Sequence, residues 1–283
     1  MRWHVVRRQR RGRPARGDHL APACRLCHDP AVTWVLDLDG VVWLADEPID
    51  GAREAVARLR ASGERVLFAT NNSWATRGDQ EAKLRRHGID AEGDVVTSAM
   101  AAAGLVEPGE RVLVCGGPGI VEAVAGRGAT PVRDGDADAV VVGFHRDFDY
   151  ERLRIAVRAI QRGARLVATN DDATYPTPDG PIPGGGALVA AVAYAAGVAP
   201  VVAGKPHPPM ADLVRAIGGE EGTMVGDRPE TDGTFAVELG YRWVLVLTGV
   251  TAAADLPVEP APDVVSPSLA ALVEGIATVG DQP

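Results

Sequence analysis

The chain has 283 residues, of which 46% are hydrophobic and 24% charged, and these proportions exclude a disordered or fibrous protein. Its net charge of −9 is unevenly spread, because residues 1–29 hold eight arginines against two aspartates, and the rest carries 21 basic and 36 acidic side chains. An acidic body argues against nucleic-acid binding, which needs a basic face, and favours a small-molecule partner. The length leads us to expect two domains.

The Arg-rich start, residues 1–30, is predicted to be a flexible tail or else sequence upstream of the true start. It contains no apolar run long enough for a signal peptide or a membrane span, and no such run follows later. We therefore expect a cytoplasmic protein with no membrane partner. Cys24 and Cys27 lack the second pair of ligands that a zinc site needs, and three cysteines do not make a disulfide framework.

From residue 31 onward, short apolar runs alternate with amphipathic segments, with Gly, Asn or Asp at the junctions, which is typical of an α/β fold. The runs are mostly continuous, as in the buried strands of a parallel sheet. Strands are predicted at Val32–Leu38, Arg65–Ala69, Arg111–Cys115, Ala139–Gly143, Arg165–Thr169, Val201–Ala203, Thr223–Gly226 and Trp243–Leu247.

Helices are predicted between several of these strands. Apolar residues at positions 52, 55, 56 and 59 share one helical face, and Gly63 follows as an end signal. The same spacing recurs at positions 153, 156, 157 and 160, followed by Gly163. Thr76 and Asp79 have the spacing of a capping box for a helix that runs towards Gly88.

No repeat of solenoid length is visible, so we expect two sheets of ordinary size in two domains. The prediction is a doubly wound, mainly parallel core built from residues 31–107 and 200–283. Residues 108–199 are predicted to form a smaller α/β domain inserted into it.

Two carboxylates, Asp37 and Asp39, close the first predicted strand just before Gly40. In doubly wound sheets, ligands bind at this edge. The two-residue spacing puts both side chains on one side of the strand, where their repulsion calls for a cation or for different protonation states. A solvated Asp-x-Asp-Gly turn is the alternative for this segment alone.

The second and later strands end in further polar groups. Thr70-Asn71-Asn72-Ser73 offers hydroxyls, amides and backbone N–H groups that suit a phosphate, although such a sequence also makes ordinary turns. Lys205 follows another strand, and its ammonium suits a phosphoryl oxygen. Taken alone, it would be a surface lysine.

A fourth strand ends in Gly226-Asp227-Arg228, with Asp232 opening the following helix. Carboxylates at such a place suit Mg²⁺, a hard cation that binds one or two carboxylates together with water and substrate oxygens. Four strand ends thus supply acids, a hydroxyl-amide loop and a lysine, which together favour phosphoryl transfer.

These four motifs, in this order, resemble those of the haloacid dehalogenase-like phosphatases, in the subgroup with NagD, phosphoglycolate and pyridoxal-phosphate phosphatases. The resemblance covers nearly everything from residue 31 onward, including Val141-Val142-Gly143 and Pro183-Gly184-Gly185-Gly186. It implies that residues 108–199 form a mobile cap, and that the enzyme is a homodimer joined through that cap.

The resemblance also implies a role for each site residue. Asp37 would be the nucleophile, and Asp39 the general acid and base. Mg²⁺ would be held by Asp37, Asp227 and the carbonyl of Asp39, and Asp232 would orient the site without binding the metal directly. The transferring phosphoryl group would be held by Thr70, Asn71, Asn72 and Lys205.

Cap contacts would select the substrate, with residues 171–186 as the specificity loop. Tyr175 in that loop would stack on a leaving group or pack as a structural residue. His145 stands where relatives often have an acid and Gly233 where they have a larger residue. We interpret His145 as structural rather than as a second acid–base group.

The expected activity is Mg²⁺-dependent hydrolysis of a small phosphate monoester through an aspartyl-phosphate. Glycolate, glycerol, pyridoxal, sugar and nucleotide phosphates are all open as substrates. The main alternative is a catalytically silent protein that binds a phosphate ligand or acts in regulation. Retention of Asp37, Asp39, Lys205 and Asp227 argues against it. Dehalogenation would not need the acidic metal cluster, and a mutase would have a different cap.

Overall fold

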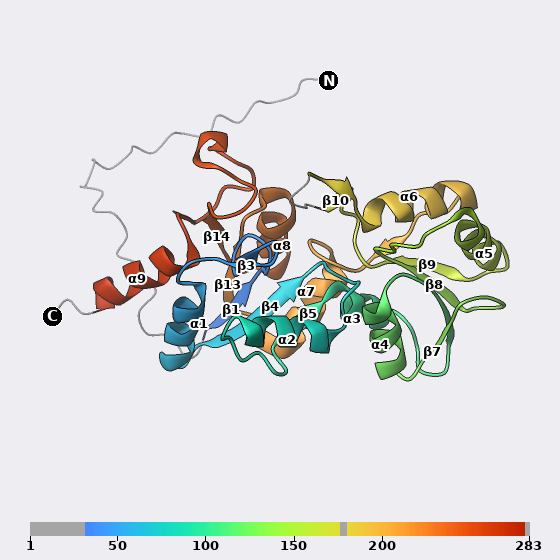
Figure 1. Ribbon diagram of the computed structural model, residues 1–283, viewed down its shortest axis with the longest axis horizontal. Helices are drawn as coiled ribbons and strands as arrows, with labels where there is room; N and C mark the ends of the chain where they lie inside the picture. Colours follow the sequence, from blue (N-terminus) through green and yellow to red (C-terminus); the bar gives the residue numbers. More distant parts are fainter. Residues whose placement is uncertain (1–31, 176–179, 281–283) are drawn as a thin grey trace, which may run out of the picture.

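The structure is a computed structural model that describes residues 32–175 and 180–280, and the side chains of all of these except 277–280. The predicted tail of residues 1–30 lies outside the described residues. So do Cys24, Cys27 and part of the predicted specificity loop. Two α/β lobes lie side by side along the long axis of the molecule (Figure 1).

The first lobe contains a six-stranded parallel sheet. In sheet order its strands are β15 (Val264–Ser266), β14 (Arg242–Val246), β13 (Gly222–Gly226), β1 (Thr33–Leu36), β4 (Arg65–Thr70) and β5 (Val95–Thr97). Leu36, at the end of β1, pairs with Phe68 of β4 and with Val225 of β13. Because the three strands are parallel and in this register, the loops that follow them meet at one edge.

The second lobe contains a five-stranded parallel sheet. Its strands, in order, are β12 (Val201–Val202), β9 (Arg165–Ala168), β8 (Ala139–Val142), β6 (Arg111–Cys115) and β7 (Thr130–Val132). The predicted doubly wound, mainly parallel α/β fold with a second α/β unit is therefore confirmed. The strand predicted at Val201–Ala203 forms, but it pairs with β9 of this sheet and not with the core sheet. The domain boundaries remain predictions.

Helices cover both faces of each sheet. They are α1 (Ala52–Ala61), α2 (Arg77–Arg86), α3 (Ser98–Ala103), α4 (Pro118–Gly126), α5 (Tyr150–Gln161), α6 (Gly185–Ala196), α7 (Pro208–Gly218), α8 (Thr234–Leu239) and α9 (Leu269–Gly280). On one face of the core sheet, α1, α2 and α9 share a buried cluster with Leu36 and Phe68. On the other face, α3, α7 and α8 pack with Val35 and Leu67.

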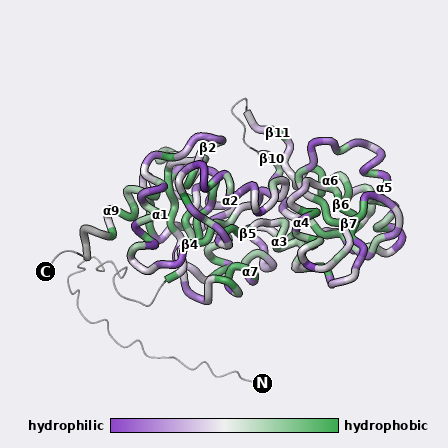
Figure 2. The backbone as a smooth tube through the Cα atoms, turned by 60° about the horizontal axis from the view of Figure 1, so that its bottom comes forward, coloured by the Kyte–Doolittle hydropathy of each residue, from purple (hydrophilic) through white to green (hydrophobic). Residues whose placement is uncertain are grey.

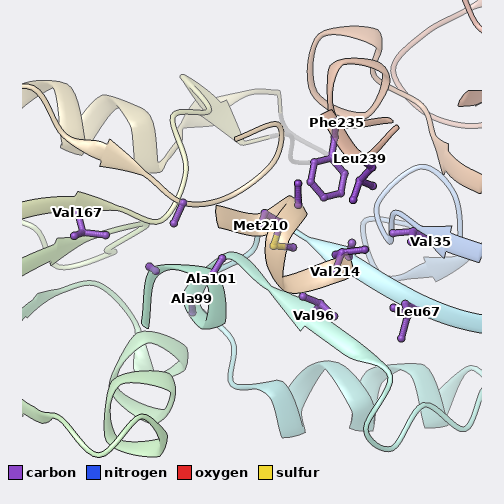
Figure 3. Packing of buried hydrophobic residues seen from close by; sticks show 14 of the residues in the cluster. Val35, Leu67, Val96, Ala99, Ala101, Val167, Met210, Val214, Phe235 and Leu239 are labelled. Atoms are coloured by element: carbon purple, nitrogen blue, oxygen red, sulfur yellow. The ribbon is translucent and has the colours of Figure 1, made fainter. Parts of the chain in front are cut away.

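The core behind α3, α7 and α8 continues into the second lobe. The same buried cluster includes Val141 of the cap sheet. Figure 3 shows Val167 of that sheet in the same cluster as Met210 of α7. A separate cluster lies between the other face of that sheet and α5 and α6. Figure 2 shows the hydrophobic segments gathered inside both lobes. The two lobes therefore have separate sheets but share one buried hydrophobic cluster.

Local signals predicted the helices α1, α2 and α5 and the strands β1, β4, β6, β8, β9, β12, β13 and β14, whereas the other helices were not predicted individually. Helix α1 covers the predicted apolar face at positions 52–59, and Thr76 and Asp79 form the capping box that begins α2. Shorter elements were missed: the three-residue strands β5, β7 and β15, and the hairpins β2 (Trp43–Leu44) with β3 (Glu47–Pro48) and β10 (Thr174–Tyr175) with β11 (Ile182–Pro183). In the part of the chain that the structure describes, no helix combines the length and apolarity needed to span a bilayer.

Candidate active site

Three acids and a lysine meet where β1, β12 and β13 end. Asp37 extends the pairing of β1 by one residue, since its N–H donates to the carbonyl of Val225 at 2.9 Å. Lys205 Nζ lies 2.8 Å from Asp37 Oδ1 and 2.8 Å from Asp232 Oδ1, and its side chain is only 2% exposed. The predicted lysine is therefore a buried cation between two carboxylates, and not a surface residue.

This cluster has more acids than bases, and its pKa values reflect that. Burial raises the pKa of Asp37 well above its ordinary value. Lys205 opposes that shift, whereas the nearby charges of Asp232 and Asp227 add to it. Burial by itself would lower the pKa of Lys205, but Asp232 and Asp37 outweigh it, so the ammonium is held in its charged form. One ammonium does not neutralise three carboxylates, so the site favours a further cation.

Asp227 has an oxygen that is open for such a cation. Its Oδ2 accepts the N–H of Val250 at 2.6 Å, whereas its Oδ1 is buried without a hydrogen-bond partner. Burial raises the pKa of Asp227 to about 6, with Asp232 contributing. An orphaned buried carboxylate oxygen is costly unless a ligand satisfies it.

The residues fit a divalent metal ion. One carboxylate oxygen from each of Asp37, Asp227 and Asp232 lies within 4.8 Å of the others. Hard divalent cations bind such oxygens. Asp232 is the most fully bonded of the three, because its Oδ2 also accepts the N–H groups of Asp227 and Arg228 at 3.2 Å each. Asp37, Asp227 and Asp232 therefore form the acidic cluster of a divalent metal site, and Asp232 is the member whose two oxygens are already bonded to Lys205 and to backbone N–H groups.

Two glycines let the backbone approach Asp227. Gly40 has a φ of +84°, and a Cβ there would lie 2.5 Å from the Asp227 carboxylate. At Gly249, a Cβ would lie 1.9 Å from Asp227 Oδ2. Neither position has room for a side chain. The two loops that follow β1 and β14 therefore close tightly around this acid.

The loop after β14 was not identified from the sequence. Thr248 Oγ1 donates to the carbonyl of Gly40 at 2.5 Å, and Thr251 Oγ1 donates to the carbonyl of Asp227 at 2.6 Å. The available signal was Thr248-Gly249-Val250-Thr251 directly after the predicted strand Trp243–Leu247, at the same sheet edge as the other motifs.

Asp39 has a different environment from Asp37. It is half-buried, and its Oδ1 accepts the indole N–H of Trp43 at 3.0 Å. Burial raises the pKa of Asp39, and the nearby charge of Lys83 opposes this shift. Asp39 lines the same cavity as Asp37. A carboxyl group with a raised pKa beside a second carboxylate is suited to donating a proton.

The loop after β4 is held by its own side chains. Thr70 Oγ1 accepts the N–H of Asn72 at 3.1 Å, and Asn72 Oδ1 accepts the N–H of Trp74 at 3.0 Å and that of Ala75 at 3.3 Å. The Asn72 side chain is therefore used to shape the loop. Thr70 also lines the cavity, where its hydroxyl still has a proton to donate.

Asn71 joins the two lobes. Its Oδ1 accepts the N–H of Lys205 at 2.8 Å, and its Nδ2 donates to the carbonyl of Lys205 at 2.9 Å and to Asp172 Oδ2 at 3.0 Å. Asp172 Oδ2 also accepts from Asn170 Nδ2 at 2.7 Å. The Asn71 amide thus positions the backbone of Lys205 and the cap loop.

A cavity of about 220 Å³ opens above this site, between the lobes. All the predicted site residues line it: Asp37, Asp39, Thr70, Asn71, Asn72, Lys205, Asp227 and Asp232. Apolar and aromatic side chains also line it, namely Leu44, Trp74, Phe144, Tyr175 and Ile182, together with the cation Arg146. Tyr175 and Ile182 lie in the predicted specificity loop, residues 171–186, whereas Leu44, Trp74, Phe144 and Arg146 were missed, because single residues in loops give no periodic signal.

Tyr175 lies in the cavity wall beside Phe144, with ring centroids 5.9 Å apart. His145 packs edge-on against the rings of Trp74 and Phe148. Burial lowers the pKa of His145, which favours its neutral form. These contacts agree with the interpretation of His145 as a structural residue.

Comparisons with known proteins give the same assignment. A family model described as haloacid dehalogenase-like hydrolase matches residues 34–130, and a related model matches residues 202–272. An acid sugar phosphatase of Staphylococcus aureus is 35% identical over 230 residues, which are 79% of this chain and 89% of that protein.

Two solved structures are similar along nearly the whole fold. A p-nitrophenyl phosphatase from Archaeoglobus fulgidus has a TM-score of 0.81 and 32% identity, covering 87% of this chain and 100% of that one. A glycerol phosphate phosphatase from Mycobacterium tuberculosis, in complex with magnesium, has a TM-score of 0.79 and 38% identity, covering 86% of this chain and 76% of that one. The chain therefore belongs to the haloacid dehalogenase-like hydrolase family and is a phosphoric monoester hydrolase of that type.

Proposed function

We propose that this chain hydrolyses small phosphate monoesters through a phospho-enzyme formed on Asp37, with Mg²⁺ as the divalent ion. One observation supports this most strongly: Asp37 lines the cavity, bonded to the buried Lys205 and within 4.8 Å of a carboxylate oxygen of Asp227. A nucleophile, a fixed cation and a metal ligand thus share one small space.

In the first step, an oxygen of Asp37 attacks phosphorus as the bond from phosphorus to the ester oxygen breaks. Since Oδ1 is bonded to Lys205, Oδ2 is the attacking oxygen. Asp39 gives its proton to the departing oxygen, so that an alcohol leaves. A product alcohol and an aspartyl-phosphate on Asp37 result.

In the second step, Asp39, now a carboxylate, removes a proton from a water molecule. The water oxygen attacks phosphorus, and the bond from phosphorus to Asp37 breaks. Inorganic phosphate is released, and Asp39 is again protonated. The same residue acts as acid and then as base, which requires a pKa nearer neutrality than that of an exposed aspartate.

The transferring phosphoryl group is held by Lys205, by the Thr70 hydroxyl and by the backbone N–H of Asn71, in the loop after β4. The amide side chains of Asn71 and Asn72 contribute by fixing this loop. Mg²⁺, held by Asp37, Asp227 and the carbonyl of Asp39, would neutralise charge between nucleophile and phosphate. Asp232 holds Lys205 and the backbone of Asp227 in place.

For the substrate class, we propose sugar phosphates and glycerol phosphate. The relatives are named acid sugar phosphatase, glycerol phosphate phosphatase and p-nitrophenyl phosphatase, and a cavity of about 220 Å³ suits leaving groups of that size. Glycolate, pyridoxal and nucleotide phosphates are the competing outcomes of a substrate panel. A cytoplasmic location and a dimer through the cap stay predictions.

The test is hydrolysis of p-nitrophenyl phosphate by the wild type with Mg²⁺, by the wild type with EDTA, and by Asp37→Asn. The asparagine keeps the shape and the acceptor for Lys205 but is not a nucleophile. We expect turnover only in the first case. When the ester carries ³²P, the label should be retained on the acid-quenched wild type but not on Asp37→Asn. Phosphate binding without turnover of any ester on the panel would instead favour the silent-binding alternative.

A further inference from the structure

Trp43 contacts the general acid directly. Its indole Nε1 donates to Asp39 Oδ1 at 3.0 Å, and the side chain is 2% exposed, among the largest fully buried side chains in the described chain. A buried indole N–H normally has an acceptor, and here the acceptor belongs to a residue of the reaction. The bond occupies Oδ1 and leaves Oδ2 to carry the proton.

The backbone of Trp43 is tied to both neighbours of Asp39. The N–H of Gly40 donates to the carbonyl of Trp43 at 2.7 Å, and the N–H of Trp43 donates to the carbonyl of Leu38 at 3.2 Å. The short turn that carries Asp39 is thus closed by Trp43 through main chain and side chain together. Rotation of the Asp39 carboxyl group is restricted as a result.

The outer face of the indole is held as well. Lys83 Nζ of α2 lies 4.2 Å from the centroid of the ring, a cation–π distance. The same ammonium donates to the carbonyl of Ala45 at 2.7 Å and pairs with Asp46 at 3.1 Å. Helix α2 therefore anchors both the ring and the turn of the β2–β3 hairpin.

We propose that Trp43 is a positioning residue that orients Asp39, so that Oδ2 faces the oxygen of the leaving group. This inference rests on the role proposed above for Asp39. The alternative is that Trp43 only fills the core. The positioning role and the core-filling role predict different effects on a series of esters. A core-packing defect weakens the hydrolysis of all esters alike, whereas a misplaced acid slows most the esters whose leaving groups need a proton.

The experiment compares kcat/KM of the wild type and Trp43→Phe on p-nitrophenyl, phenyl and glycerol phosphate. The leaving groups need increasing help from a proton in this order. The phenylalanine retains an aromatic ring beneath Lys83 and removes the N–H donor. We expect a loss within about threefold on the nitrophenyl ester, rising to about tenfold or more on glycerol phosphate. Equal losses on all three esters would overturn the proposal.

Trp34→Phe is the matched control, because Trp34 is also buried, at 4% exposure, in the same hydrophobic cluster. We expect its effect to be the same on all esters. Should Trp43→Phe not fold, as judged by thermal unfolding, Trp43→Met decides, because it also removes the indole N–H and leaves the charge of Lys83 in place. It should give the same trend across the three esters, and equal losses on all three would count against the proposal.

Asp39→Asn separates this inference from the one on which it rests. If Asp39→Asn shows no dependence on the leaving group, the role of Asp39 fails and the role of Trp43 with it. If Asp39→Asn shows that dependence and Trp43→Phe does not, only the positioning role of Trp43 fails.

Discussion

Gly249 is a residue at which one methyl group should disturb the metal site. A Cβ there would lie 1.9 Å from Asp227 Oδ2, and this carboxylate is 2% exposed with no room to retreat. We expect Gly249→Ala to raise the Mg²⁺ concentration for half-maximal activity by about tenfold or more, as for other residues that orient metal ligands. A titration of activity with Mg²⁺ measures this.

Gly126→Ala is the control, because a Cβ at the end of α4 would meet nothing within 4 Å. Its Mg²⁺ dependence should match that of the wild type. An unchanged titration curve for Gly249→Ala would mean that the loop after β14 yields easily, and that it does not fix Asp227.

Single residues were predictable where several signals met. Asp37 and Asp227 each stand at the end of an apolar strand, and parallel strands bring such ends to one edge. The buried position of Lys205 was not predictable, because a lysine after Gly204 looks the same whether or not two carboxylates fold over it. The contact from Trp43 to Asp39 depends on the β2–β3 hairpin, whose strands have two residues each and are too short to show a periodic pattern.

At the scale of elements, the link between the lobes depends on the loops after β4 and β9. Asn71 Nδ2 donates to Asp172 Oδ2 at 3.0 Å. Asn71→Asp would place two carboxylates in contact, and we expect a loss of about 1–3 kcal/mol in the free energy of unfolding, measured by urea denaturation. Adding Asp172→Asn restores a donor and an acceptor and should recover part of the loss.

Asp171→Asn is the matched control for that rescue. Asp171 is the neighbour of Asp172, but its Oδ2 contacts His207 Nε2 at 2.8 Å, on the core side, and not Asn71. Combined with Asn71→Asp, it removes the same charge without supplying the donor. Equal recovery with Asp171→Asn and Asp172→Asn would show a general charge effect, and the direct bond would then contribute little.

The elements that sequence reasoning placed correctly carry a local signal, which is a continuous apolar run in a strand and an apolar spacing or a capping pair in a helix. Helix α1 and its glycine end follow from the spacing of its apolar residues, and α2 follows from Thr76 and Asp79. The sheet to which strand β12 belongs could not be predicted in this way. Val201 and Val202 are apolar enough for either sheet, and only the packing of the two lobes decides that they pair with β9.

At the scale of the whole molecule, the acidic cluster should couple stability to pH and to Mg²⁺. In the metal-free protein the pKa of Asp227 is about 6, raised mainly by burial, and that of Asp37 is also raised. A raised folded-state pKa gives a stability contribution that is present below the ordinary value of about 4 and is lost as the pH rises through about 6. The metal-free protein should therefore lose stability across this window.

Mg²⁺ binds the carboxylate form, so its stabilising effect should change in the opposite direction. At pH 5, protonation of Asp227 competes with the ion, and one pH unit below the pKa weakens binding about tenfold, or by about 1.4 kcal/mol. We expect the rise in Tm on adding Mg²⁺ to be small at pH 5 and clearly larger at pH 7. In Asp227→Asn the rise at pH 7 should be reduced and should depend less on pH, since one titrating ligand is gone and Asp37 remains. If Mg²⁺ raised the Tm of the wild type equally at both pH values, the ion would bind away from Asp227. The oxygen of Asp227 that lacks a hydrogen-bond partner would then not be a metal ligand.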